Sequence, residues 1–491
     1  MVDRRRFLAG GMAAISLTAL GSDRESTYGS EGQVATYTLV PAASELFRNR
    51  LEMHVKGNIH LSRNELVSRT VERKIPLDHR SVLDYEERLY HVNGQELVGS
   101  RRHFLEAISE GETARKQVHL QLRQSAREVA CHVGGGRSTT YALDAFLTPE
   151  ELDLIQPPAN SLAINLLIPQ QPLALEQAFP LQEEGLRILL HLDGIQEHNV
   201  EGTLVSVDAK AAKLTLVGTV QGSAAGVPTR FDLAGKMTYS LEQRQYTWLA
   251  MGIRERREIG KAEPGFEVSA TLKLVRKPLD ATTKLGERPL GEQPGPAELL
   301  VNLYSTSGKY AVLMDRRWQM ISQSPSLSRL RMVENDRDVA QCDVRHLPPL
   351  KPGQQVTLEG LESDLRRSLG SSLHEVLHAS EDKNSSDVRV VRFHAMGSVS
   401  DVPVEWFVAY CSDDQGNRIF ATFTMASENV DVFSGADDQF VHSIRFLDLS
   451  ALDEHEKGGA DPGVGSSVAP STSPANPQNV KTGKTTRPVK R

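Results

Sequence analysis

The sequence predicts an α+β protein, in which a large, curved antiparallel sheet shaped like a half-barrel precedes a smaller domain of strands and helices. Apolar and polar residues alternate over several stretches of residues 34–277, which indicates strands with one solvated face. Proline and glycine cluster in residues 278–297, as is typical of a linker. Residues 298–449 then combine strand and helix patterns.

The first domain shows its strands most clearly near residue 51. Leu51, Met53 and Val55 face one way, and the polar residues between them face the other. The same alternation predicts further strands at residues 204–207, 214–220, 230–239 and 266–274. Thr148 followed by Pro149 is the start signal of a short helix, and residues 181–192 predict a second one. A curved sheet with a few helices on one side accommodates all of these elements.

Three segments of this domain resemble an uncharacterised family of exported bacterial proteins. They are Ser161 to Pro169, Gly218 to Gly226, and Arg254 to Gly260 with Glu263-Pro264-Gly265. That family supplies no known activity. The pattern of elements also resembles the open half-barrels of periplasmic lipid and lipoprotein carriers, although a fold does not determine a function.

The second domain, residues 298–449, is similar to the PsbP-like family. The resemblance rests on an opening strand from Lys309 to Trp318, a long helix over 358–379, strands at 388–393, 404–410 and 419–425, a helix near 436–440 and a closing strand over 441–446. It implies an α/β/α sandwich, and a non-catalytic protein that docks on partner proteins. No binding residue is transferred, because none of the matching positions is a functional motif.

The pattern of the first 21 residues predicts a twin-arginine signal peptide. Arg4 and Arg5 precede Phe7-Leu8, and an apolar segment too short to span a bilayer follows. Cleavage before Ser22 and a flexible segment over 22–33 are expected. The sequence therefore predicts export to the periplasm or cell envelope. A basic start before a buried helix is the alternative.

Residues 450–491 are expected to form a disordered basic tail, because their Gly, Ser, Pro and Thr content cannot bury a core. A solvated tail without a partner is one interpretation, and contact with an anionic envelope polymer or lipid is the other. The net charge of the whole chain, −7, does not favour nucleic-acid binding. No other segment is apolar enough to span a membrane, so an integral membrane protein is not expected.

Cofactors and metals are not predicted. The three cysteines, Cys131, Cys342 and Cys411, match no metal motif, and either buried free thiols or a Cys342–Cys411 disulfide is compatible with their positions.

The sharpest catalytic candidate is the run His374-Glu375-Val376-Leu377-His378. Two histidines four residues apart on a helix can bind zinc, with the glutamate as general base. On the predicted helix, however, the apolar stripe from Leu358 to Val376 places both histidines on the solvated side. A third zinc ligand could be Glu381 or His394, but no feature of the sequence places either residue near the two histidines. A solvated helix face is therefore preferred to a zinc site.

Four other groups have both an ordinary and a functional interpretation. Cys131 to Arg137 fits a strand and turn better than a reactive thiol or anion site, and His54 and His60 beside Glu52 fit a hydrated sheet face. Arg254 to Glu258 fits a solvated edge or ion-pair ladder better than a phosphate site. Tyr246 and Trp248, taken to share a face, fit core packing better than a ligand pocket.

The resulting hypothesis is a non-catalytic binding or structural protein of the cell envelope, with no catalytic, cofactor or metal residues. Its partner would be an apolar ligand or another protein. A zinc-dependent hydrolase that uses His374, Glu375 and His378 is the alternative.

Overall fold

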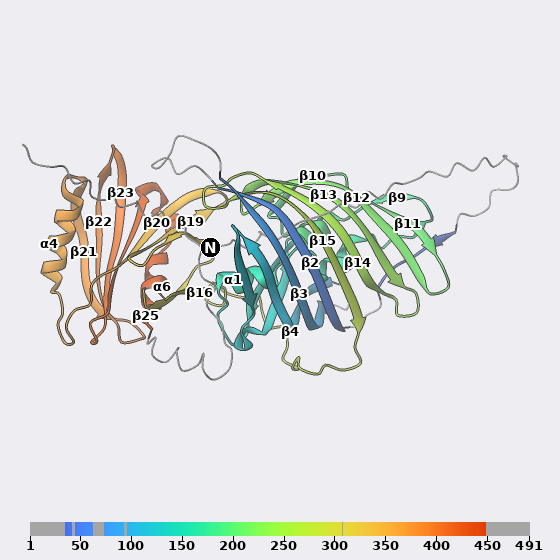
Figure 1. The fold of residues 1–491 in the computed structure, drawn as a ribbon, viewed down its shortest axis with the longest axis horizontal. Coiled ribbons are helices and arrows are strands. Elements are labelled where there is room, and N and C mark those ends of the chain that lie inside the picture. Colours follow the sequence, from blue (N-terminus) through green and yellow to red (C-terminus); the bar gives the residue numbers. More distant parts are fainter. Residues whose placement is uncertain (1–34, 42–44, 62–72, 93–95, 307, 448–491) are drawn as a thin grey trace, which may run out of the picture.

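The structure is a computed structural model that describes residues 35–41, 45–61, 73–92, 96–306 and 308–447 (Figure 1). The predicted signal peptide (1–21), the segment 22–33 and the basic tail (450–491) lie outside the described residues.

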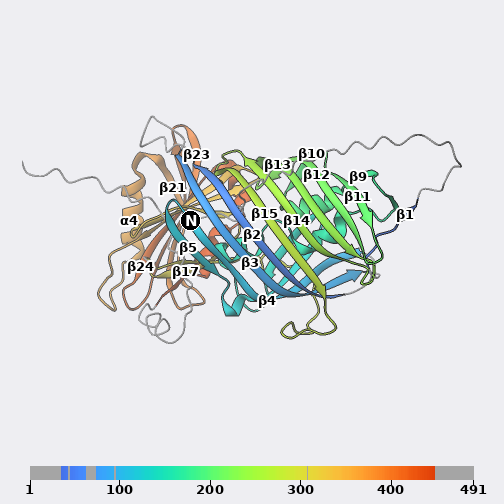
Figure 2. The ribbon, with the colours of Figure 1, turned by 45° about the vertical axis from the view of Figure 1, so that its right-hand side comes forward.

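One antiparallel sheet of thirteen strands dominates the first part of the chain (Figures 1 and 2). Its main path runs β7-β6-β4-β3-β2-β15-β14-β13-β12-β11-β9, with β5 beside β4 and β10 beside β12. The strands are β2 (Leu46–Leu61), β3 (Arg73–Val92), β4 (Glu96–Thr113), β5 (Lys116–Gln121), β6 (Glu128–Gly134), β7 (Arg137–Ala142), β9 (Ala178–Pro180), β10 (Gly194–His198), β11 (Glu201–Val207), β12 (Ala211–Ala224), β13 (Val227–Ser240), β14 (Gln245–Arg257) and β15 (Gly265–Pro278). A separate pair joins β1 (Thr36–Tyr37) to β8 (Leu173–Ala174).

The alternation seen in the sequence sorts side chains onto two faces of this sheet. Leu51, Met53 and Val55 are buried, as are Phe266 and Leu274 on the neighbouring strand, and Leu51 pairs with Leu274. The predicted strands of this domain are thus confirmed. We call the side that carries these residues the inner face, and the opposite side the outer face.

Three short helices cover the inner face: α1 (Pro149–Ile155), α2 (Ser161–Leu167) and α3 (Glu183–Leu190). Helix α1 begins where the sequence predicts, because the Thr148 hydroxyl accepts from the Glu151 amide and the Glu151 carboxylate accepts from the Thr148 amide. The apolar sides of the helices join the buried side chains of the sheet in one core.

A seven-stranded antiparallel sheet forms most of the second part, in the order β18-β19-β20-β24-β23-β22-β21. The strands are β18 (Trp318–Gln323), β19 (Leu327–Glu334), β20 (Arg337–His346), β21 (Leu373–Lys383), β22 (Arg389–Val399), β23 (Val402–Ser412) and β24 (Arg418–Ala426). A three-stranded sheet contains β16 (Val301–Ser305), β17 (Tyr310–Met314) and β25 (Arg445–Phe446). The helices are α4 (Leu358–Leu369), α5 (Val430–Phe433) and α6 (Ala436–His442), and 3-10 turns span Gln124–Ala126, Gly370–Ser372 and Ser427–Asn429.

The predicted fold class is wrong. Strands make up 57% of the described residues and helices 14%, so the molecule is mainly β rather than a balanced α+β protein. The second part is built around a seven-stranded antiparallel sheet, and no PsbP-like α/β/α sandwich is present in the described residues. The expected closing strand over 441–446 shrinks to two residues, because helix α6 continues to His442.

The long helix predicted over 358–379 ends ten residues early. Gly370 follows Leu369 with a positive φ of 54°, a conformation that ends helices. The chain then enters strand β21, which pairs with β22 through two β-bulges. Each bulge adds one residue, so Leu373, Val376 and Ala379 all reach the α4 side at a spacing of three, which imitates a helix.

Residues 279–300 have neither helix nor strand, and they lie against the outer face of the first sheet. Leu290 packs with Ala130 and Tyr141 there. The Arg101 guanidinium, which is 1% exposed, donates to backbone carbonyls of this segment. Residues 279–300 are therefore attached to the outer face of the first sheet at several points.

Candidate functional site

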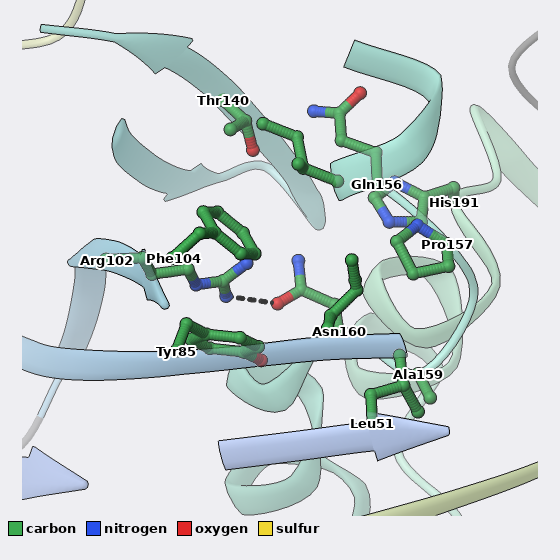
Figure 3. A pocket seen from close by; sticks show the side chains of 12 residues that line it. Leu51, Tyr85, Arg102, Phe104, Thr140, Gln156, Pro157, Ala159, Asn160 and His191 are labelled. Carbon is green, nitrogen blue, oxygen red and sulfur yellow. Dashed lines mark hydrogen bonds between the residues drawn. The ribbon is translucent and has the colours of Figure 1, made fainter. Parts of the chain in front are cut away.

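A narrow pocket opens on the inner face, between strands β2–β4 and the loop that joins α1 to α2 (Figure 3). The pocket is small, with room for about one water molecule. The lining residues are Leu51, Leu83, Tyr85, Arg102, Phe104, Thr140, Ile155, Gln156, Pro157, Ala159, Asn160 and His191. We call this cavity the inner pocket.

Local sequence explains how the pocket wall is built. Pro157 and Pro158 follow α1 and prevent its continuation, and the Asn160 side chain accepts from the Leu162 amide to begin α2. Between them Ala159 is buried with a φ of +75°, and its amide donates to the Leu189 carbonyl. His191, the residue after α3, also has a positive φ.

Two non-glycine residues with positive φ thus line one pocket. Such backbone conformations cost free energy and recur at ligand sites and active sites.

Beside the pocket lies a buried group of three charges, which we call the inner-face ion cluster: Glu87, Arg102 and Arg276. The Glu87 side chain is 0% exposed, and its carboxylate accepts from Arg102 Nε at 2.8 Å. Its second oxygen lies 3.7 Å from Arg276 Nη2. The three residues come from β3, β4 and β15, and strand alternation directs each of them inward.

Neutral groups complete the surroundings of the cluster. Glu87 also accepts from Asn49 Nδ2 and Ser161 Oγ, both at 2.8 Å. Arg102 Nη2 donates to the Asn160 side-chain oxygen at 2.6 Å, an interaction drawn in Figure 3. Arg276 Nη1 donates to Asn165 Oδ1 at 3.0 Å, and its guanidinium carbon lies 3.9 Å from the centre of the Phe47 ring. Helix α2 is thereby tied to the sheet through polar contacts.

The pKa values of the three groups show which of them is stabilised as an ion. Burial works to raise the pKa of Glu87, but the charges of Arg102 and Arg276 outweigh it and hold that pKa below its usual value. Burial likewise opposes the charge of Arg102, whose pKa nevertheless rises because of Glu87. For Arg276 burial prevails and lowers the pKa. One carboxylate therefore compensates one arginine well and the other poorly.

Several donors of the cluster lack a hydrogen-bond acceptor among the described residues. Arg276 Nε and Nη2 are buried without one, apart from the 3.7 Å ion pair. Arg102 is 4% exposed and lines the pocket; its Nε and Nη2 are engaged, whereas Nη1 has no acceptor within the described part of the chain. The site can accordingly offer positive charge and N–H donors to a ligand.

The His374 to His378 run does not lie on a helix but on the edge strand β21, which removes the premise of the zinc hypothesis. Both histidines are exposed; His374 Nε2 contacts Ser398 Oγ at 3.3 Å, and His378 pairs in register with His394, whose ring contacts Glu405 at 2.7 Å. In the described ranges no three His, Cys, Asp or Glu side chains are grouped so that they could hold a metal ion.

The cysteine and histidine candidates have ordinary structural roles. Cys131 is buried in β6, and a turn at Gly135 and Gly136 joins β6 to β7, as the strand-and-turn interpretation predicts. Cys342 and Cys411 are buried and free, so the possible disulfide is not formed. His54 lies on the outer face and contacts Asp78 at 2.8 Å.

Two sequence-based interpretations of β14 need correction. In the run 254–258, Glu255 and Arg257 are buried as an ion pair on the inner face, and only the residues between and beside them are solvated. Tyr246 is buried in the core, whereas Trp248 points to the other side. A β-bulge between Tyr246 and Trp248, opposite Thr238 and Tyr239, shifts the alternation, so the two aromatic side chains lie on opposite faces.

The inner-face ion cluster was not predicted from the sequence, although a signal for it was present. Arg276 continues the inward series of Leu272 and Leu274 at a spacing of two. A charged residue in phase with a buried series indicates either a partner or a site.

No protein-family model and no curated protein matches the chain. Among solved structures, it is similar to the translocator domain of the autotransporter NalP from Neisseria meningitidis, with 6% identity over 78% of this chain and 88% of that chain and a TM-score of 0.10. A mutant porin of Rh. blastica is 7% identical over 78% of this chain and 99% of that chain, with a TM-score of 0.09. The P pilus usher (PapC) translocation pore is 8% identical over 78% of this chain and 99% of that chain, with a TM-score of 0.14. Likeness at this level carries no argument about this protein. Within the described residues, no helix has the length and apolar character needed to cross a membrane.

Proposed function

We propose that this protein is a non-catalytic binding protein, exported to the periplasm or cell envelope, that holds a small apolar or amphipathic ligand in the inner pocket. The observation that carries the proposal is the make-up of this pocket. Leu51, Leu83 and Phe104 supply apolar walls, while Arg102 and Asn160 bring buried polar groups to the same space. Small-molecule sites combine these features.

The pocket is narrow, so a ligand larger than a few atoms requires α1, α2 and their joining loop to shift from the inner face. The strained conformation of Ala159 supports such a shift, because the folded contacts around it must offset its conformational cost. Binding would relax this loop or exchange its contacts for contacts with the ligand.

Export rests on the twin-arginine pattern at Arg4 and Arg5. A thirteen-stranded sheet in which β2 pairs with β15 contains many contacts between distant residues, and such topologies fold slowly. Transport of the folded protein suits a chain of this kind. Replacing both arginines by lysine is expected to retain the protein in the cytoplasm, as cell fractionation would show.

Ligand binding in the inner pocket is tested by a substitution that fills the pocket with a larger side chain. Protein purified from the periplasmic fraction should carry a bound amphiphile that native mass spectrometry detects. Leu83→Phe adds volume at a wall residue that is 3% exposed, and it should abolish this adduct. Val217→Phe makes the same type of addition at a side chain that is 61% exposed, and it should leave the adduct unchanged. A wild-type protein without any adduct, or an adduct that survives Leu83→Phe, would contradict the proposal.

A further inference from the structure

Resting on the proposed function, we infer that the inner pocket takes the carboxylate end of a long-chain monocarboxylate, and that Arg102 is the group that receives it. In the inner-face ion cluster two guanidinium groups share one carboxylate, so the cluster carries one excess positive charge. Each of the three side chains is at most 4% exposed, so water screens this excess poorly.

An uncompensated buried charge costs folding free energy unless something pairs with it. The aromatic rings of Phe47 and Tyr85 and the Asn165 amide oxygen offset part of this cost, since they face the two arginines. None of them carries a negative charge. A monoanionic ligand would supply the missing charge and would add its binding free energy at the same time.

The open donor identifies where the anion would lie. Arg102 Nε and Nη2 are committed to Glu87, Asn160 and Ser161, which fixes the plane of the guanidinium. Its Nη1 has no acceptor within the described part of the chain and can donate to a ligand in the pocket. Figure 3 shows the Arg102 guanidinium on the pocket wall, beside the Asn160 side chain.

Charge favours a carboxylate over a phosphate. A phosphate monoester carries about −1.5 to −2 charges at neutral pH, which would overcompensate the single excess charge of the cluster. Once α1, α2 and their joining loop have shifted from the inner face, the apolar chain of the ligand would continue along Leu51, Leu83 and Phe104.

Calorimetric titration of the delipidated full chain with dodecanoate, dodecanol and dodecyl phosphate tests this. We expect dodecanoate to bind at least about tenfold more tightly than either of the others, because only it supplies a single negative charge. Equal affinity for the acid and the alcohol, or tighter binding of the phosphate, would overturn the inference and leave the proposed function intact. If none of the three binds, the proposed function fails as well.

Variants that change the charge of the inner-face ion cluster test whether that charge sets the affinity for the carboxylate. Glu87→Gln raises the excess charge of the cluster and should strengthen dodecanoate binding on the order of tenfold, while Arg276→Met removes the excess and should weaken it by a similar factor. Neither residue lines the pocket, so dodecanol affinity should stay constant. Asn49 Oδ1 has no partner in the described residues, and after an amide flip it can accept from the new glutamine.

Arg254→Gln removes one positive charge from the exposed outer face and serves as the matched control. It should leave all three affinities unchanged. Thermal unfolding of each variant shows which of them fold. If Arg276→Met does not fold, Glu87→Gln alone decides the outcome, because an unchanged or weaker dodecanoate affinity in that variant contradicts the inference.

Discussion

At the scale of single residues, the Glu86 carboxylate fastens residues 283–285 to the outer face. Its Oε1 accepts from the Thr283 amide at 2.8 Å and from its hydroxyl at 2.6 Å, and its Oε2 accepts from the Lys284 and Leu285 amides, both at 2.9 Å. Burial opposes the charge, but these hydrogen bonds lower the pKa of Glu86 to about 2. The charged carboxylate is therefore the form that holds the segment.

Glu86→Gln should speed amide hydrogen exchange at residues 283–285 at neutral pH, after correction for intrinsic rates, since a neutral amide keeps only one acceptor oxygen. The folded pKa lies below the ordinary value of 4.5, so the stabilisation is complete above pH 4.5 and is lost as the pH falls toward about 2. Wild-type protection should fall in that window, and the variant should show little change there. Glu287→Gln, at an exposed position of the same segment, is the control. Equal protection in all three proteins would contradict this role.

At the scale of elements, strand β21 shows how an apolar pattern can indicate the wrong structure. The helix predicted over 358–379 includes Leu373 and Val376 because their spacing fits a helix. Gly370 was a stop signal in the same stretch, but bulges depend on pairing with β22, which no local pattern reveals.

On a strand, His374 and His378 lack the shared helical face on which zinc ligands four residues apart depend. Replacing both by glutamine should leave the metal content of purified protein unchanged, because both side chains are exposed on an edge strand. Elemental analysis by mass spectrometry measures this. Stoichiometric zinc that disappears in the double variant would revive the hydrolase hypothesis.

At the scale of the whole molecule, the two large sheets meet at a pair of turns. Asp336, between β19 and β20, accepts from the Lys261 amide at 2.7 Å, and Arg331 Nη1 donates to the Lys261 carbonyl at 2.8 Å. Gly226 has a φ of +78°, and a Cβ there would lie 2.4 Å from the Asn335 carbonyl carbon. Only glycine allows this approach.

Gly226→Ala should therefore loosen the contact between the sheets, which faster proteolysis of residues 279–300 and a larger radius of gyration in X-ray scattering would detect. Gly353 has nearly the same φ, +79°, with no atom within 4 Å of its added Cβ. Gly353→Ala thus introduces the same backbone strain without the clash, and it should leave both readouts close to the wild type. Equal effects of the two substitutions would show that backbone strain, rather than the interface, is responsible.

Elements with a local pattern could be predicted from the sequence alone. The alternation of Leu51, Met53 and Val55, and the Thr148 cap of α1, concern neighbours along the chain, so they could be recognised without any fold. The other features depend on contacts between distant segments of the chain. The inner-face ion cluster needs β3, β4, β15 and α2 in register, and the bulges of β14 and β21 arise from strand pairing. Contacts between residues far apart in the sequence leave no periodic trace within any one segment. The inner pocket was for this reason found in the fold rather than in a motif.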